Sequence, residues 1–289
     1  MSNGAEDRER HADGGTWSGA DGAQAFAALD TATDRLLGYP FVFAALSRRT
    51  GRTGGTGGTA GTGTTAGTGT AAGTAGTRGG LTLVDYGCGP GQVADLAARE
   101  LGVRVVGVDT SPEMLALARA GAPAVAEYHL VEDNRVTGLP DECADAVMCN
   151  HVLASLPTQE AVLAVFTEIR RLLRPGGLLV LLTTDPDCAG REYASLRIGG
   201  TGDGALRPGE ELTVRLRRTD GSWQEVHNHA WPVSVLPELL EQSGFRAVVQ
   251  ERPTVDEAAA LADPALVAAH AWTAERARPP LVVTTALAG

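Results

Sequence analysis

The sequence has no concentration of positive charge. Its formal net charge is −11 and its pI is about 5.0, and its arginines are scattered along the chain. Because such an acidic surface repels a phosphate backbone, a nucleic-acid substrate is disfavoured. Arg170, Arg171 and Arg174 are close in sequence, but they are typical of the solvated end of a single helix. We therefore expect no nucleic-acid partner.

Paired cysteines and long apolar runs are also missing. Four cysteines show neither C-x-x-C spacing nor zinc-ligand clustering: Cys88, Cys143, Cys149 and Cys188. We expect reduced thiols and no metal. Residues 1–13 contain no apolar region that could act as a signal peptide, and no run approaches the length of a membrane span. These absences favour a cytoplasmic protein without a membrane partner.

Composition divides the 289 residues into four segments. Residues 1–23 are rich in Gly, Asp, Glu and Arg and predict a disordered leader. Residues 24–49 carry apolar side chains at helical intervals, broken at 38–40, and predict an N-terminal lid of two short helices. Residues 50–80 are almost wholly Gly, Thr and Ala, which predicts a flexible linker because nothing there can be buried. Residues 81–289 are long enough for one α/β domain.

A strand, a glycine turn and a helix around Asp85 organise that domain. Strand-favouring residues lead into Asp85, and then come Gly87, Gly89 and Gly91. Glycine at alternate positions lets a ligand lie directly against the main chain. A dinucleotide fingerprint would need glycine where Gln92 stands, and no Gly-Lys-Ser or Gly-Lys-Thr phosphate loop is present. The Asp85 charge disfavours a pyrophosphate and suits a cation such as S-adenosylmethionine.

This stretch resembles the first motif of the class I S-adenosylmethionine-dependent methyltransferases. The resemblance continues through a second strand over 102–109, which ends in Asp109, and through Thr110-Ser111-Pro112-Glu113-Met114, where Ser111 or Thr110 caps a helix. It implies that Asp109 accepts hydrogen bonds from the ribose hydroxyls of the cofactor. The cofactor-binding residues that it implies here are Asp85, Gly87, Gly89, Gly91, Asp109, Thr110 and Met114.

The resemblance also implies roles at the ends of the next two strands. Residues 126–134 predict a third strand, and Asp133 with Asn134 fits the place where the family holds the adenine. Residues 145–153 predict a fourth strand, whose carboxyl end faces the reacting methyl group and places Asn150 at the cofactor. His151 is the candidate general base, since a histidine can take a proton from an acceptor as the methyl group transfers. The alternative is that His151 packs beside the methionine tail or hydrogen-bonds a loop.

The rest of the chain predicts a helix over 160–173, a central strand over 178–184 and a β-hairpin insertion over about 209–231. A helix over 233–243 and closing strands over 245–250 and 281–285 follow, with an alanine-rich helical segment at 255–274 between the strands. Because the hairpin follows the fifth strand, we expect it to wall the substrate site. Candidate substrate-binding residues are Tyr39, Tyr193, His227, His229 and Trp231. A metal pair at His227 and His229 would lack a third ligand.

The resemblance implies an α/β, Rossmann-like, seven-stranded mixed sheet with helices on both faces, a β-hairpin insertion and an N-terminal helical lid. It also implies methyl transfer from S-adenosylmethionine to a small-molecule acceptor in biosynthesis. No Asn-Pro-Pro-Tyr follows the fourth strand, so amide and adenine amino nitrogens are disfavoured acceptors. One alternative is a cyclase that converts S-adenosylmethionine to azetidine-2-carboxylate and releases methylthioadenosine. Another is a protein that binds S-adenosylmethionine without catalysis. The acceptor atom and the oligomeric state stay open.

Overall fold

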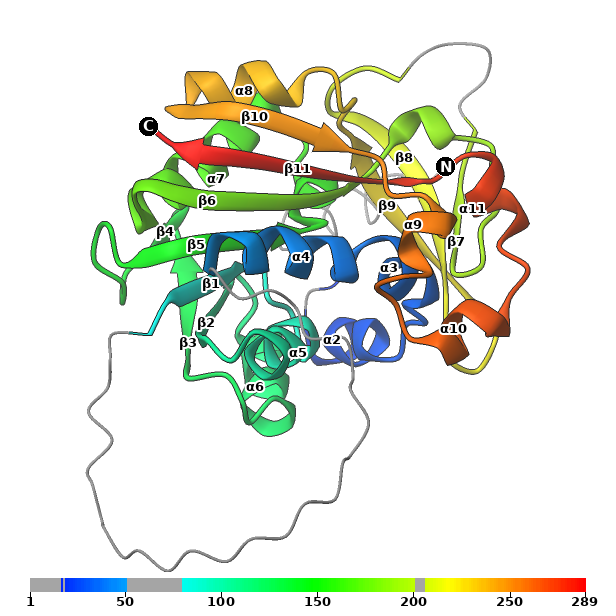
Figure 1. Ribbon diagram of the computed structural model, residues 1–289, viewed down its shortest axis with the longest axis horizontal. Coiled ribbons are helices and arrows are strands. Elements are labelled where there is room, and N and C mark those ends of the chain that lie inside the picture. Colours follow the sequence, from blue (N-terminus) through cyan, green and yellow to red (C-terminus); the bar gives the residue numbers. More distant parts are fainter. Residues whose placement is uncertain (1–16, 18, 51–79, 201–205) are drawn as a thin grey trace, which may run out of the picture.

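The computed structural model describes residues 17, 19–50, 80–200 and 206–289. An eight-stranded sheet forms its centre, and a three-stranded sheet lies beside it (Figure 1). In spatial order the large sheet contains β10 (Phe245–Glu251), β11 (Leu281–Ala288), β6 (Leu173–Thr184), β5 (Ala144–Asn150), β1 (Thr82–Tyr86), β2 (Arg104–Asp109), β3 (Glu127–Glu132) and β4 (Arg135–Val136). The expected mixed sheet is confirmed. The strand beyond the expected seven is β4, which was missed because two residues carry no readable pattern.

The central strands β1, β2, β3, β5 and β6 run parallel, so their carboxyl ends meet at one edge. Their apolar runs explain the arrangement, because a parallel sheet is covered on both faces. Asp85 of β1 pairs with Gly107 of β2 and with Met148 of β5. The expected closing pair is also confirmed, since β11 runs antiparallel to both β6 and β10. The sheet therefore presents the ends of β1, β2 and β5 together.

Helices cover both faces of this sheet (Figure 1). On one face lie α7 (Gln159–Leu172) and α8 (Leu236–Gln242). Phe166 and Ile169 of α7 are buried there in the same apolar cluster as Leu181. On the other face lie α3 (Ala32–Leu37), α4 (Tyr39–Thr50), α5 (Gln92–Leu101) and α9 (Val255–Ala258). There Leu46 of α4 shares an apolar cluster with Leu182 of β6. These two layers hold the strand ends in place.

The N-terminal helices differ from expectation at one boundary. The break at Gly38 is confirmed, because α3 ends at Leu37 and α4 starts at Tyr39. However, a further helix, α2 (Gly19–Ala27), starts inside the expected leader, so the boundary at residue 23 is wrong. Most of the leader and of the 50–80 linker lies outside the described residues. None of the described helices is long and apolar enough to cross a membrane.

The hairpin insertion is present and is larger than expected. Its strands β8 (Glu210–Arg217) and β9 (Trp223–Ala230) pair antiparallel, and β7 (Leu196–Ile198) adds a third strand at the edge of β8. The expected turn at Gly221 has φ of 85°, which favours glycine. The alanine-rich C-terminal segment forms α9 and then two short helices, α10 (Pro264–Ala269) and α11 (Thr273–Ala277), in place of one continuous helix.

Candidate functional site

The glycine turn after β1 is the base of the site. Gly87 and Gly91 have φ of 77° and 80°, and a side chain at Gly87 would collide with Val152. These positions therefore require glycine for two reasons, the backbone angle and the lack of space. The backbone N–H of Gly87 donates to Val108 O at 2.8 Å, which ties the turn to β2. Gly91 is the N-cap of α5, so the unpaired N–H groups of that helix begin at the turn.

Asp109, at the end of β2, closes the turn from the other side. Its Oδ2 accepts a hydrogen bond from Gly89 N at 2.8 Å, and its Oδ1 accepts one from Ser111 N at 2.9 Å. Burial raises the pKa of Asp109, and these backbone hydrogen bonds act in the opposite direction. The structure thus brings the second acid of the sequence motif directly against the glycine turn.

The helix α6 (Pro112–Gly121) begins beside Asp109, as the sequence predicts. Of the two residues considered for its cap, Ser111 is the one that acts, because its Oγ accepts from Met114 N at 3.1 Å. Met114 is 4% exposed and is one of the buried residues of α6. Thr110 is exposed. Both residues remain predicted contacts of the cofactor.

Asp85 and Asn150 make the site chemically suited to a cation. Asp85 is 2% exposed, and burial, followed by the charge of Asp109, raises its pKa to about 8. Asn150 ends β5, and its side-chain oxygen and nitrogen are both buried without a hydrogen-bond partner among the described residues. Unpaired buried polar atoms are costly. A ligand with an ammonium, a sulfonium and a carboxylate would pair with the ionised form of Asp85 and satisfy Asn150, so these residues fit S-adenosylmethionine.

The N-terminal helix α2 covers the glycine turn. The Phe26 ring lies against Gly89, where a Cβ atom would meet it at 3.5 Å. Phe26 in turn packs edge-on against Trp17, with ring centroids 5.1 Å apart. Aromatic rings at this place exclude water from the turn. Of the N-terminal helices, α2 is thus the one that lies against the glycine turn, whereas Leu46 of α4 lies near the start of β1. A lid over the cofactor stays a prediction.

His151 follows Asn150 and adopts the left-handed conformation, with φ of 59°. Its backbone N–H donates to Leu182 O at 2.9 Å, which fixes the residue at the carboxyl edge of the sheet. Its ring Nε2 donates to Asp34 Oδ1 at 2.7 Å. Among the described residues we find no other hydrogen bond to the ring, and a third of the side chain is exposed. A neutral imidazole held in this way presents Nδ1 as a proton acceptor.

Asp34 is the residue that sequence reasoning missed. It lies on α3, and its side chain is 18% exposed. The contact joins residues 117 positions apart in the sequence, and no local motif marks Asp34. Burial, followed by the charges of Asp34 and Asp85, raises the pKa of Tyr39, which packs against the apolar cluster that contains residues of α3 and α4. A substrate role for Tyr39 stays a prediction.

Asp133 and Asn134 form the tight turn between β3 and β4. Both are exposed, and their φ angles are 48° and 59°. Positive φ at two successive residues is typical of a type I′ hairpin turn, where Asp and Asn are favoured. The geometry of this turn by itself accounts for Asp and Asn at these two positions. Their contact with an adenine stays a prediction.

Two of the candidate substrate residues are buried in the interior. Trp231 is 3% exposed, and its Nε1 donates to Leu156 O at 3.0 Å. This bond holds the segment that follows His151 against the end of β9. Tyr193 is also 3% exposed and belongs to the apolar cluster under the small sheet. A substrate role for either residue stays a prediction.

The two histidines of β9 make their hydrogen bonds within the small sheet and the loop that leads into it. His227 is exposed, and its Nδ1 lies 3.1 Å from Glu211 Oε1. His229 donates from Nδ1 to Gly209 O at 3.2 Å. Within the described ranges, no group of three or more His, Cys, Asp or Glu side chains is arranged to hold a metal ion. A substrate role for either histidine stays a prediction.

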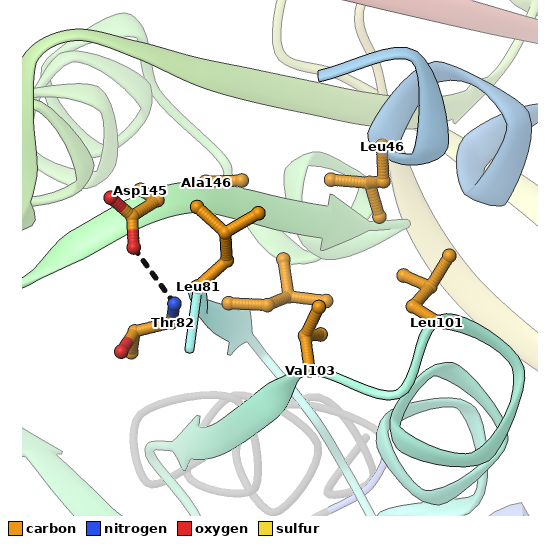
Figure 2. A pocket seen from close by; sticks show the side chains of 8 residues that line it. Leu46, Leu81, Thr82, Leu101, Val103, Asp145 and Ala146 are labelled. Carbon is orange, nitrogen blue, oxygen red and sulfur yellow. Dashed lines mark hydrogen bonds between the residues drawn. The ribbon is translucent and has the colours of Figure 1, made fainter. Parts of the chain in front are cut away.

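A small apolar cavity of about 20 Å³ lies at the opposite edge of the sheet, where β1, β2 and β5 begin (Figure 2). Asp145 Oδ2 there accepts a hydrogen bond from Thr82 N at 2.8 Å, as the dashed line shows. The cavity has room for about one water molecule. Because ligands of such sheets bind at the carboxyl ends of the strands, this cavity is a packing gap.

Residues 84–181 match a family model described as a methyltransferase domain. A relative from Streptomyces griseus, N-demethylindolmycin N-methyltransferase, is 34% identical over 170 residues, which are 58% of this chain and 71% of the relative. The chain belongs to the class I S-adenosylmethionine-dependent methyltransferases. Its cofactor is S-adenosylmethionine.

Other members of the family show the same likeness. The trans-aconitate 2-methyltransferase of Rhizobium rhizogenes is 29% identical over 216 residues, covering 68% of this chain and 79% of that enzyme. The solved structure of the CcbJ methyltransferase from Streptomyces caelestis is 17% identical, with a TM-score of 0.50, covering 73% of this methyltransferase and 85% of that one. The latter likeness supports the fold.

Proposed function

We propose that this methyltransferase transfers a methyl group from S-adenosylmethionine to a small-molecule acceptor in biosynthetic metabolism and releases S-adenosylhomocysteine. The observation that carries the proposal is the His151 ring, which Asp34 holds one residue beyond Asn150 at the end of β5. The relative named for N-demethylindolmycin, a small molecule, supports this acceptor class. The net charge of −11 also disfavours nucleic acid.

The proposed cofactor contacts come from three strand ends. The bound cofactor supplies an electrophilic methyl group on a sulfonium. Asp85 and Asn150 would hold its charged amino-acid end, and the glycine turn would lie against it. Asp109 would accept the ribose hydroxyls with the lone pairs left free by Gly89 and Ser111. Asp133 and Asn134 would border the adenine.

On the acceptor side, His151 would remove a proton from the attacking atom as the methyl group transfers. Asp34 would keep the ring in one tautomer and stabilise its charged form. Because Asp34 belongs to α3, the base would be complete only when the N-terminal helices are packed on the sheet. Phe26 and Tyr39 would exclude water from the same region.

The reaction is tested by incubating the full chain with S-adenosylmethionine, alone and with acceptors that include N-demethylindolmycin and trans-aconitate, the compounds named for its relatives. S-adenosylhomocysteine formed only with an acceptor is the expected result. Methylthioadenosine formed without any acceptor would favour the cyclase. Binding without turnover over a broad panel of hydroxyl, amine and thiol acceptors would favour a non-catalytic protein.

The first prediction concerns the His151 and Asp34 pair. His151→Asn, which tolerates the left-handed backbone, should lower kcat by about 10²- to 10⁴-fold. Asp34→Asn should lower kcat by about tenfold, because the ring loses its charged partner. The Kd of S-adenosylmethionine, measured by calorimetry, should not change in either variant. Arg35→Gln, an exposed neighbour on α3, is the matched control. Wild-type kcat in His151→Asn would exclude the base role and leave methyl transfer intact.

A further inference from the structure

A second cavity lies away from the glycine turn. Its volume is about 310 Å³, which is within the size range of small-molecule sites. The segment before β7, the ends of β8 and β9, and the chain around α11 form its wall; Figure 1 shows these elements at the side of the molecule away from β2 and β3. Its lining contains none of Asp85, Asp109, Asn150 and His151. It is therefore distinct from the proposed cofactor site.

Two oppositely charged side chains on the wall of this cavity, Arg217 and Glu275, both bond to the backbone of Ala194. Arg217 donates from Nη1 to Ala194 O at 3.5 Å, and Glu275 Oε1 accepts from Ala194 N at 2.8 Å. In the part of the chain that the structure describes, neither side chain takes part in an ion pair. Glu275 is 2% exposed, and a buried carboxylate without a cation is costly. A ligand that carries both charges would satisfy both groups.

The remaining wall of this cavity is aromatic. Trp223 and His270 are half-buried there, and Trp272 is held by a hydrogen bond from its Nε1 to Val267 O at 2.9 Å. The rings of His270 and Trp272 meet edge to face, with centroids 4.8 Å apart. The Arg197 guanidinium lies 4.0 Å from the ring centre of Trp223. Rings fixed in this way suit a flat aromatic group.

We propose that this cavity binds an aromatic α-amino acid. The ligand's carboxylate would pair with Arg217, whose planar guanidinium can bind both carboxylate oxygens. Its ammonium would pair with Glu275, because Glu192, which also lines the cavity, already pairs with Arg197 at 2.8 Å. Its ring would pack against Trp223 and His270. The charge pattern excludes a plain hydrocarbon and disfavours a phosphate, because two carboxylates lie on the same wall as Arg217.

The cavity is connected to the helix that carries Asp34. Thr33 is fully buried, and its Oγ1 lies 3.5 Å from Glu275 Oε1, while its N–H donates to Ser195 Oγ at 3.1 Å. The next residue, Asp34, holds His151. A ligand on Glu275 thus binds one hydrogen bond away from α3, and its effect on the site would pass through that helix.

Calorimetry on the full chain tests the proposal with L-tryptophan as the probe, in saturating S-adenosylhomocysteine so that the cofactor site is filled. The comparison compounds are tryptamine, which lacks the carboxylate, indole-3-propionate, which lacks the ammonium, and L-alanine, which lacks the ring. L-Tryptophan should bind at least about tenfold more tightly than each comparison compound, because each one lacks either a charge-assisted contact or the burial of the ring. The measurement involves no methyl transfer, so its failure is separate from that of the proposed function.

Two variants assign the contacts. Arg217→Gln should weaken L-tryptophan and indole-3-propionate by about tenfold or more and leave tryptamine unchanged. Glu275→Gln, which keeps an oxygen for Ala194 N, should weaken L-tryptophan and tryptamine and leave indole-3-propionate unchanged. Arg215→Gln, on the same face of β8 but paired with Glu225 in solvent, is the matched control. Unchanged S-adenosylmethionine binding shows that each variant is folded. No binding of L-tryptophan by the wild type would overturn the proposal, and so would variants that both bind L-tryptophan as tightly as the wild type does.

Discussion

Asp85 combines two properties that conflict unless a cation is bound. It is buried at the end of β1, and its pKa is raised to about 8 by burial and by the charge of Asp109. At neutral pH most of the free protein therefore carries a protonated Asp85. A cationic cofactor prefers the ionised form, so its binding must release that proton.

The pH dependence of cofactor binding follows from this shift. Below a pKa of about 8, affinity for S-adenosylmethionine should rise with pH by about tenfold per unit, and it should level off above that value. Calorimetry between about pH 6 and 8.5 measures the slope. Asp85→Asn, which cannot ionise, should bind more weakly at the high end and show no slope of this kind. A flat profile in the wild type would contradict the raised pKa.

Folding should respond to the same group with the opposite sign. The folded pKa is above the unfolded value of 3.8, so the folded state holds a proton that the unfolded chain has already lost. The contribution of Asp85 to stability is thus fully present below about pH 4 and declines as pH rises to about 8. Urea unfolding of the wild type and of Asp85→Asn measures this at both ends of the range. The difference between their free energies of unfolding should be smaller at acidic pH.

Asp109 is predicted to bind the ribose. Asp109→Ala should weaken S-adenosylmethionine binding by about 1.5 to 3 kcal/mol, the usual value of charge-assisted hydrogen bonds. Because Asp109 also accepts from Gly89 and Ser111, part of the loss could come from a displaced turn. Asp109→Asn keeps one acceptor oxygen and should give a smaller loss. Unchanged affinity in the alanine variant would show that the second acid is misassigned.

Among the helices, α7 is fastened by a buried ion pair. Glu168 is 5% exposed, and it accepts from Val136 N at 2.7 Å and from Arg171 Nε at 2.7 Å. Arg171 also donates to Leu139 O and Asp141 Oδ1. This cluster joins α7 to the loop between β4 and β5, and so it stabilises the strand that ends at Asn150, one residue before His151.

Removing Arg171 should therefore be costly. Arg171→Met should lower the free energy of unfolding by about 3 kcal/mol, because the Glu168 carboxylate stays buried without its cation. Arg174→Met, which breaks a more exposed pair with Asp145, should cost at most about 1 kcal/mol. Urea denaturation measures both values. Similar losses in the two variants would show that the buried ion pair contributes no more to stability than the exposed one.

The two sheets meet through the N-terminal helices. Asp30 N–H donates to Arg217 O at 2.8 Å, and Thr219 N–H donates to Ala28 O at 2.9 Å. The buried Thr33 adds side-chain contacts to Ser195 and Glu275. The helix α3 therefore lies between the small sheet on one side and the His151 end of β5 on the other. Its position depends on both parts of the molecule.

Thr33→Val tests this connection. The change keeps the side-chain shape but removes the hydroxyl, so it should cost about 1 to 2 kcal/mol of stability. Amide hydrogen exchange should show the loss as faster local opening of α3 and the ends of β7, with little change in β1, β5 and β6. Thr273→Val, an exposed threonine on α11, is the control. Uniformly faster exchange over the large sheet would contradict a local role.

Much of the molecule could be predicted from short stretches of sequence. The turn at Gly87, the positions of Asp85 and Asp109 at the strand ends, and the cap at Ser111 are predicted correctly because each depends on its immediate neighbours. The large sheet follows for the same reason, since apolar runs of strand length specify parallel strands covered on both faces. The strand β7 was missed because three residues carry little pattern. The start of α2 was missed because its first turn is rich in glycine.

The pairing of Asp34 with His151 could not be predicted in this way. The two residues are 117 positions apart, and they meet because α3 packs on the sheet through apolar residues such as Leu36 and Leu37. Arg217 and Glu275 flank Ala194 through folding of the same kind. Local spacing thus specified the fold and the glycine turn, whereas the packing of distant segments paired His151 with Asp34 and formed the second cavity, because contact between remote side chains depends on how whole layers come together.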